Sequence, residues 1–240
     1  GVGRLPEPVA IVEWLEAQLC KTSELEGTTV LVTAGGTQEN IDPVRYIGNR
    51  SSGKMGYAIA EQAVRMGANV ILVSAPTSLS VPSGVEFVPV DSALSMQEAV
   101  ESRYKNVDVV VMAAAVSDFR VLHKAEQKIK KMESMTLELV KNPDILQGLG
   151  SQKEHQILVG FAAETEHVIK YGQDKVARKN LDMLVANDVS KSNAGFNVDT
   201  NEGYFLYPDK DPKEMANMKK SELAQYIMKE VVELVANKHP

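Results

Sequence analysis

The sequence predicts an α/β fold in which a mainly parallel sheet is covered by helices on both faces. Two apolar runs, residues 30–32 and 109–116, contain no polar interruption and are typical of strands buried on both sides. Segments of helical periodicity lie between such runs, and this alternation indicates parallel strands joined by crossover helices. Residues 202–208 have the pattern of a late antiparallel strand that is added to the sheet.

The individual elements follow from the spacing of apolar residues and from turn residues. Strands are expected over residues 28–34, 69–75, 85–90, 107–115, 156–162 and 181–187, with a shorter candidate near 136–140. Helices are expected over about 54–67, 93–104, 144–152, 166–180 and 218–237, with a turn at 209–213 before the last one. Because ligands of parallel sheets bind beyond the carboxyl ends of the strands, residues that follow the strands are the first candidates for a site.

The N-terminal residues differ from the rest of the chain. Residues 3–8 contain two prolines and read as a linker, and Ile11, Trp14, Leu15 and Leu19 then form the apolar stripe of a short helix. We therefore expect a linker and short helix over residues 1–27 and one domain over residues 28–240.

The composition excludes several classes of protein. The chain has 240 residues, 44% hydrophobic and 24% charged, which is ordinary for a soluble globular protein. No apolar run approaches the roughly 20 residues of a membrane span, and no signal peptide is visible. The single Cys20 fits a reducing cytoplasm, and with four histidines it argues against structural zinc. The net charge of −6 argues against nucleic-acid binding, so an anionic ligand needs a local cluster of lysines.

A phosphate site is indicated where the first strand ends. Gly35 and Gly36 follow that strand, and residues 51–54, Ser-Ser-Gly-Lys, open the next helix. Small residues let backbone N–H groups approach phosphate oxygens, and a helix N-terminus with Lys54 adds positive potential. Met55 stands where a P-loop has Ser or Thr, and the dinucleotide fingerprint is absent. Tight turns and close helix packing are the alternative explanation of the glycines.

Four further groups follow the later strands. Asp118 comes after three small residues, 113–115, and it can bind a sugar hydroxyl or cap the next segment. The run 128–131, Lys-Ile-Lys-Lys, is a solvated face or a phosphate contact. Phe161 can stack on a base or fill the core. Lys175 and Lys179 are four residues apart and share a helix face, where they flank an anion or lie on the surface.

Together these motifs resemble one family, phosphopantothenoylcysteine synthetase, the phosphopantothenate–cysteine ligase of coenzyme A biosynthesis. The resemblance extends from residue 28 to the final helix, and the motifs that carry it are TAGGTQENIDPVRYIGNRSSGKMG, AAAVSDFR, KIKK, VKNPDI, GFAAET and KNLDMLVANDV. The KIKK form resembles the bacterial, CTP-dependent type. Residues 1–17 resemble the linker of the bacterial bifunctional protein, in which a flavin-dependent decarboxylase lies upstream. One departure is Gly35–Gly36, where relatives often have Gly-Pro.

The resemblance implies a Rossmann-like fold, a cytoplasmic homodimer with substrate sites close to the partner subunit, and a two-step reaction. The carboxylate of 4′-phosphopantothenate attacks the α-phosphorus of CTP, and the cysteine amine then attacks the acyl-cytidylate. Mg²⁺ and lysines would neutralise the triphosphate. By resemblance Asn49 and Lys128 are catalytic, and Arg45, Ser51, Ser52, Gly53 and Lys54 hold the substrate phosphate. The nucleotide would be bound by Met112, Ala113, Ala114, Asp118, Lys128, Pro143, Asp144, Ile145, Leu146, Phe161, Lys175 and Lys179.

Two other functions are compatible with parts of the pattern. Tyr171 and Lys175 have the Tyr-x-x-x-Lys spacing of short-chain NAD(P)-dependent reductases. The missing glycine fingerprint, and a second strand that ends in Ser-Ala-Pro-Thr without an acidic residue, count against that class. A nucleotide-sensing module that has lost its chemistry is the non-enzymatic alternative, and the presence of Asn49 and Lys128 argues against it.

Overall fold

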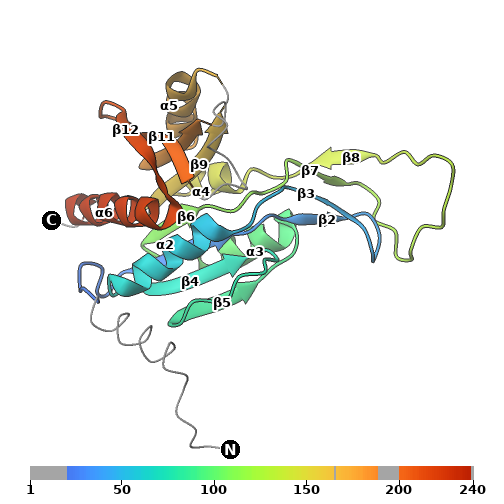
Figure 1. Cartoon of the computed structure of the whole chain (residues 1–240), viewed down its shortest axis with the longest axis horizontal. Coiled ribbons are helices and arrows are strands. Elements are labelled where there is room, and N and C mark those ends of the chain that lie inside the picture. Colours follow the sequence, from blue (N-terminus) through green and yellow to red (C-terminus); the bar gives the residue numbers. More distant parts are fainter. Residues whose placement is uncertain (1–20, 165, 189–199, 239–240) are drawn as a thin grey trace, which may run out of the picture.

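The computed structural model describes residues 21–164, 166–188 and 200–238, and its centre is an eight-stranded sheet (Figure 1). The strands, in sheet order, are β12 (Lys213–Lys219), β11 (Thr200–Leu206), β10 (Met183–Asp188), β9 (Ile157–Glu164), β6 (Val109–Met112), β1 (Thr29–Ala34), β4 (Asn69–Ser74) and β5 (Val85–Pro89). The six strands from β10 to β5 are parallel, and β11 and β12 are antiparallel to their neighbours. The predicted α/β class and the late antiparallel strand are therefore confirmed.

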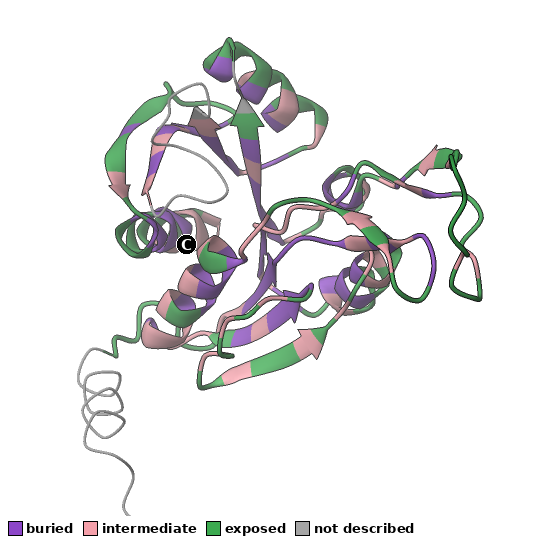
Figure 2. Cartoon of the chain, turned by 45° about the vertical axis from the view of Figure 1, so that its right-hand side comes forward, coloured by how far each residue is buried: buried purple, intermediate pink, exposed green. Residues whose placement is uncertain are grey.

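Helices cover both faces of the sheet, as the continuous apolar strands require. The helices are α2 (Lys54–Arg65), α3 (Ala93–Tyr104), α4 (Ile145–Ser151), α5 (Val168–Arg178) and α6 (Lys220–Lys238). One core cluster joins the strands to α2 and α6, and a second joins them to α3, α4 and α5. Burial follows the strands and the inner faces of the helices (Figure 2).

Two small antiparallel pairs extend from the carboxyl-end side of the sheet. They are β2 (Gln38–Asn40) with β3 (Tyr46–Gly48), and β7 (Phe119–Val121) with β8 (Leu139–Lys141). We call residues 119–141 the arm, because this segment reaches away from the sheet and is largely exposed (Figures 1 and 2). The strand candidate near 136–140 is thus β8, which belongs to the arm rather than to the main sheet.

The strand β12 was not expected from the sequence, which suggested a turn and then a helix from about residue 218. Only Met215 of this edge strand is buried, so the alternating pattern of a half-buried strand is weak. Backbone pairing with β11 creates the strand instead. The middle of α6 is tied to this region by Glu230, which accepts hydrogen bonds from the Tyr207 hydroxyl and the Lys213 ammonium.

Residues 1–20, with the expected N-terminal helix, lie outside the described residues. Residues 21–27 pack on the end of α2, where Leu25 is fully buried and its N–H donates to the Met66 carbonyl at 2.9 Å. Among the described residues, no helix combines the length and apolar character that crossing a bilayer requires.

Candidate functional site

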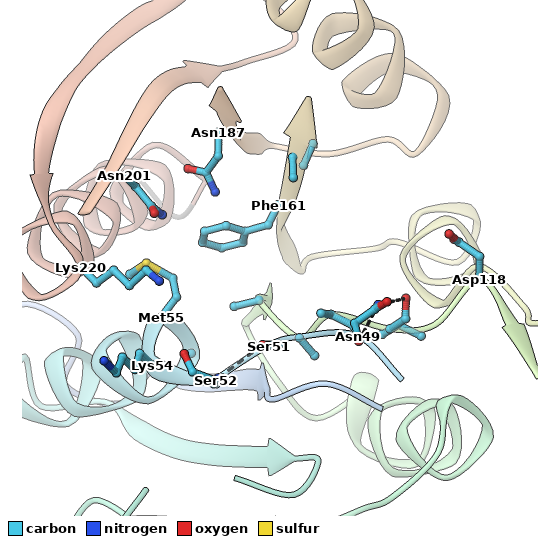
Figure 3. A pocket seen from close by; sticks show the side chains of 18 of the residues that line it. Asn49, Ser51, Ser52, Lys54, Met55, Asp118, Phe161, Asn187, Asn201 and Lys220 are labelled. Atoms are coloured by element: carbon cyan, nitrogen blue, oxygen red, sulfur yellow. Dashed lines mark hydrogen bonds between the residues drawn. The ribbon is translucent and has the colours of Figure 1, made fainter. Parts of the chain in front are cut away.

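A cavity of about 330 Å³ opens beyond the carboxyl ends of β6, β9 and β10 and beside the start of α2 (Figure 3). Parallel α/β sheets bind ligands in this position. The lining residues come from seven parts of the chain: Asn49, Ser51, Ser52, Gly53, Lys54, Met55, Gly56, Ala113, Ala114, Ala115, Val116, Asp118, Phe161, Ala162, Ala163, Lys175, Asn187, Asn201 and Lys220.

Two glycines allow the N-terminus of α2, which forms one wall of the cavity, to lie close to the sheet. Gly53 precedes α2 with φ of 77°, a left-handed conformation that favours glycine, and a Cβ there would lie 2.6 Å from the Thr77 side chain. A Cβ on Gly56 would lie 2.6 Å from that of Ala34 in β1. These close contacts point the N-terminus of α2 into the cavity, and α2 has no acidic residue in its first turn and no side-chain cap. This wall can therefore attract an anion.

The floor is backbone held in place by hydrogen bonds. The N–H of Ala114 donates to the Thr33 hydroxyl at 3.1 Å, and that of Ala115 donates to the Gly35 carbonyl at 2.8 Å. The Asn49 amide donates to the carbonyls of Ala115 and Val116 at 3.3 and 3.4 Å. Asn49 thereby ties the loop before α2 to the segment that leads to Asp118, although the two lie far apart in sequence.

The lining is positively charged in an acidic protein. It carries three lysines, Lys54, Lys175 and Lys220, and one carboxylate, Asp118, whereas the whole chain has a net charge of −6. Asp118 and the lysines of α2 and α6 lie at opposite ends of the cavity in Figure 3. The arrangement can hold a molecule whose anionic part meets the lysines while a hydroxyl-bearing part meets Asp118.

Sequence reasoning missed one end of the cavity, where Phe161 is accompanied by Asn187, Asn201 and Lys220 (Figure 3). Asn187 ends the predicted strand 181–187 and lies within the motif KNLDMLVANDV, so its position after a strand was an available signal. Asn201 and Lys220 carried no comparable signal, since they reach the cavity through β11 and the start of α6. Phe161 is half-buried: it packs against the core and also lines the cavity, so both the core-filling and the stacking interpretations stay open.

Several predicted nucleotide residues lie outside the lining. Met112, Ile145 and Leu146 are buried in the core on the α3–α4 side. The Lys179 ammonium pairs with the Asp144 carboxylate at 2.9 Å, so the expected sharing of one anion by Lys175 and Lys179 is not seen here. Burial opposes ionisation of Asp144, yet Lys179 keeps the pKa of that carboxyl below its ordinary value. Pro143 starts the same segment and does not reach the cavity.

Arg45 and Lys128 are also outside the cavity. Arg45 pairs with the buried Asp42, with Nε 3.0 Å from the carboxylate, and donates to the Ile129 carbonyl at 3.0 Å. Ile129 in turn donates its N–H to Asp42 at 3.1 Å, which fastens the KIKK segment to the β2–β3 hairpin. The Arg45 guanidinium, aided by three backbone N–H groups, holds the pKa of Asp42 well below its ordinary range. Lys128 immediately precedes Ile129 in the chain and is exposed.

A second cavity, of about 310 Å³, lies beside the contacts that join Asp42, Arg45 and Ile129. It is lined by Arg45, Lys130, Lys131, Met132, Glu133, Ser134 and Met135. The expected substrate-phosphate group is therefore divided: Ser51, Ser52, Gly53 and Lys54 line the first cavity, and Arg45 lines the second.

The residues do not form the site of a short-chain reductase. Lys175 lines the cavity, but Tyr171 is 44% exposed and is not part of the lining. Within the described part of the chain, no three His, Cys, Asp or Glu side chains gather closely enough to hold a metal ion.

Comparison with known proteins shows the family of the chain. A family model described as the DNA/pantothenate metabolism flavoprotein C-terminal domain matches residues 25–235. The coenzyme A biosynthesis bifunctional protein CoaBC of Bacillus subtilis is 48% identical over 238 residues, which cover 98% of this chain and 59% of the relative. CoaBC of Escherichia coli K12 is 44% identical and is covered to 58%. The chain thus spans less than two thirds of the length of these curated relatives.

Solved structures share the fold. The crystal structure of the C-terminal domain of CoaBC matches with a TM-score of 0.78 and 42% identity, covering 90% of this chain and 100% of that one. A Cab2 mutant in complex with phosphopantothenate-cysteine matches with a TM-score of 0.69 and 19% identity, covering 97% of this chain and 96% of that one.

Proposed function

The chain belongs to the family of the DNA/pantothenate metabolism flavoprotein C-terminal domain, and from this premise we propose that it is the phosphopantothenate–cysteine ligase of coenzyme A biosynthesis. The reaction would join 4′-phosphopantothenate to L-cysteine at the expense of CTP. The observation that carries the proposal is the cavity, in which three lysines and one carboxylate line a pocket of an otherwise acidic chain. Such a pocket suits a nucleoside triphosphate.

The chemistry needs no nucleophile from the protein. A carboxylate oxygen of 4′-phosphopantothenate attacks the α-phosphorus of CTP, the bond from that phosphorus to the bridging oxygen breaks, and pyrophosphate leaves. The cysteine amine then attacks the acyl carbon, an amide forms, the amine loses a proton, and CMP leaves. The residues of this chain would contribute orientation and charge neutralisation: Lys54 and Lys175 toward the phosphates, and Asp118 toward the ribose hydroxyls.

The residues fit a magnesium ion that arrives with the nucleotide. Mg²⁺ is commonly held by one or two carboxylates together with substrate phosphates and water, and Asp118 is the one carboxylate in the lining. When bound, Mg²⁺ would neutralise phosphate charge. A dedicated protein cage is not required for this role.

We extend the proposal to a homodimer, because the arm and the hairpin beside it expose apolar side chains. Val44 is 62% exposed, Phe119 51% and Met132 63%, and Tyr46, Leu122, Met135 and Leu139 are exposed as well. Soluble monomers rarely expose such a group of apolar residues, and a second copy of the chain would cover them. The arm also carries Lys128, so a dimer offers a route by which this lysine reaches a nucleotide site. The single Cys20 fits a cytoplasmic setting.

The test is direct. The protein is incubated with CTP, Mg²⁺, 4′-phosphopantothenate and cysteine, and CMP, pyrophosphate and the cysteine adduct are measured. Equimolar formation of the three products supports the proposal, and omission of cysteine should stop the release of CMP. Hydrolysis of CTP without an adduct, or oxidation of NADH by the same preparation, would refute it.

A further inference from the structure

Asn142 lies directly after β8, the last strand of the arm (Figure 1). It is 5% exposed and does not line the first cavity. Its Nδ2 atom donates to the Ser117 carbonyl at 2.9 Å, and its N–H donates to the Asp118 carbonyl at 2.7 Å. One buried residue therefore holds the carbonyl groups on both sides of the Asp118 Cα atom.

The Asn142 amide is fixed in one orientation. Its Oδ1 atom accepts a hydrogen bond from Nη1 of Arg120 at 3.1 Å, and the same Nη1 donates to the Lys141 carbonyl at 3.0 Å. An amide that turned over would direct its NH₂ group at the guanidinium and its oxygen at the Ser117 carbonyl, so both hydrogen bonds would be lost. The residue type therefore matters, because a carboxylate of the same shape keeps the contact with Arg120 but cannot donate to Ser117.

The other side of the same segment is held by Thr37, which is fully buried. The Thr37 hydroxyl accepts a hydrogen bond from the N–H of Ser117 at 2.9 Å, and the Thr37 N–H donates to the Ala115 carbonyl at 3.2 Å. Asp118, in contrast, is exposed where it lines the first cavity (Figure 3). Packing does not hold an exposed carboxylate, so its place depends on how firmly its backbone is held.

Asn142 also has a fixed support on its own side. Asp144, two residues later, caps the start of α4 with its side chain and pairs with Lys179 at the end of α5. The helix α5 carries Lys175, which lines the first cavity. This short segment therefore connects the backbone that carries Asp118 to the helix that carries Lys175.

We propose that Asn142 is a positioning residue that acts through Asp118. By holding the carbonyls of Ser117 and Asp118, it keeps the Asp118 carboxylate where it can accept hydrogen bonds from the ribose hydroxyls of the nucleotide. This assignment rests on the proposed function. A carboxylate on a fixed backbone loses little conformational freedom when the ribose binds, so more of the hydrogen-bond energy remains as affinity.

The experiment compares the affinities of the whole chain for CTP and 2′,3′-dideoxy-CTP, with Mg²⁺, by isothermal titration calorimetry. The ratio of the two dissociation constants reports the contact with the ribose hydroxyls, and the wild type should prefer CTP by about 10-fold or more, as expected for hydrogen bonds to a charged group. Asn142→Asp should weaken CTP binding by about 10-fold and dideoxy-CTP binding by less than about twofold. An added charge or a general loss of stability would weaken both nucleotides alike and leave the ratio unchanged.

Asn142→Ser removes the amide without adding a charge and should lower the same ratio. Asp118→Ala should abolish the preference, and adding Asn142→Asp to it should change the ratio no further, because residues that act as one unit are not additive. Gln156→Glu is the matched control. It also replaces a buried amide, whose Nε2 donates to the Tyr104 carbonyl at 3.2 Å, but it lies at the amino end of β9 and should keep the wild-type ratio.

Thermal melting of each variant checks the fold. The assignment is wrong if the wild type binds both nucleotides equally, if the Asn142 variants keep the wild-type ratio, or if Asn142→Asp lowers the ratio further once Asp118 is gone. It is also wrong if neither Asn142 variant folds, since the residue would then serve the fold alone. In each of these cases CTP binding by the wild type leaves the proposed function standing, whereas a wild type that does not bind CTP contradicts both.

Discussion

Replacing Asn49 by aspartate is expected to separate the two half-reactions of the proposed ligase. The Asn49 amide lies in the loop before α2 and donates to the carbonyls of Ala115 and Val116 at 3.3 and 3.4 Å. Both hydrogen bonds are long and therefore weak, so a substrate oxygen that gains charge competes well for the same N–H groups. Aspartate has nearly the same shape but offers no donor, and its charge would face other anions.

The magnitudes decide between a structural and a catalytic role. Loss of two weak hydrogen bonds at an exposed residue costs about 1 kcal/mol together, which corresponds to roughly a fivefold effect. Loss of a donor that meets developing charge costs about 3–4 kcal/mol, or 10² to 10³ in rate. A rate loss well above fivefold therefore cannot come from the loop contacts alone.

The assay is a quenched time course of pyrophosphate and CMP, with and without cysteine. If Asn49 acts in the second step, Asn49→Asp should release pyrophosphate for about one turnover per site while the ligation rate falls by about 100-fold. Asn49→Ala serves as the control, because it removes the same donors without adding charge. Equal loss of both products would place Asn49 in the first step, and a loss of fivefold or less would show that it only ties the two loops together.

Three further predictions concern other parts of the molecule. Lys128→Gln should lower turnover by about 10²-fold and change the free energy of unfolding by less than about 0.5 kcal/mol. The control Lys124→Gln, on the same exposed segment, should leave both turnover and stability unchanged. Wild-type turnover of the Lys128 variant in a steady-state assay would remove that residue from the mechanism. CTP should be preferred over ATP in competition assays. The backbone N–H and C=O groups of residues 113–115 are fixed in position, so groups that pair with cytosine would be left without a partner when a purine occupies the site. Equal turnover of CTP and ATP would contradict this specificity. Tyr207→Phe should lower the free energy of unfolding in urea by about 1–2 kcal/mol, since it removes a buried hydrogen bond to a carboxylate. Burial opposes ionisation of Glu230, yet hydrogen bonds from Lys213 and Tyr207 hold the pKa of its carboxyl below the ordinary value. Glu230 therefore stabilises the fold above the ordinary pKa of glutamate, and this contribution is lost as the pH falls through the folded-state pKa. Without the Tyr207 hydroxyl the pKa is lowered less, so the variant should lose less stability on acidification than the wild type, and identical pH curves would disprove the coupling.

Much of the candidate site could be located from the sequence, because many of its residues lie at or just after the ends of strands that the sequence itself predicts. The glycine pair and residues 51–54 follow one strand, Asp118 and residues 113–115 follow another, and Phe161 lies on a third. Parallel strands bring their carboxyl ends to one edge, so these groups meet without further information. The structure places residues 51–54, residues 113–115, Asp118 and Phe161 in the lining of the same cavity, whereas Gly35 and Gly36 do not line it.

The partners of individual lysines could not be read in this way. The spacing of Lys175 and Lys179 suggested a shared anion, but Lys179 pairs with Asp144 at the start of α4. Lys220 belongs to no motif that could be recognised in the sequence. It lies in the cavity lining because α6 begins directly after the edge strand β12. The contact between two side chains depends on how their elements pack, which neighbouring residues along the chain do not encode.

The sequence by itself determined the α/β class, the succession of the main strands along the chain and the edge of the sheet at which the cavity opens, because hydrophobic periodicity and turn residues are properties of consecutive residues. The tertiary structure alone decided that β12 is a strand, that the arm extends away from the sheet, and that Lys54, Lys175 and Lys220 border one cavity. Edge pairing, burial and charge clustering arise between residues distant in the chain, and only the packed fold brings those residues into contact.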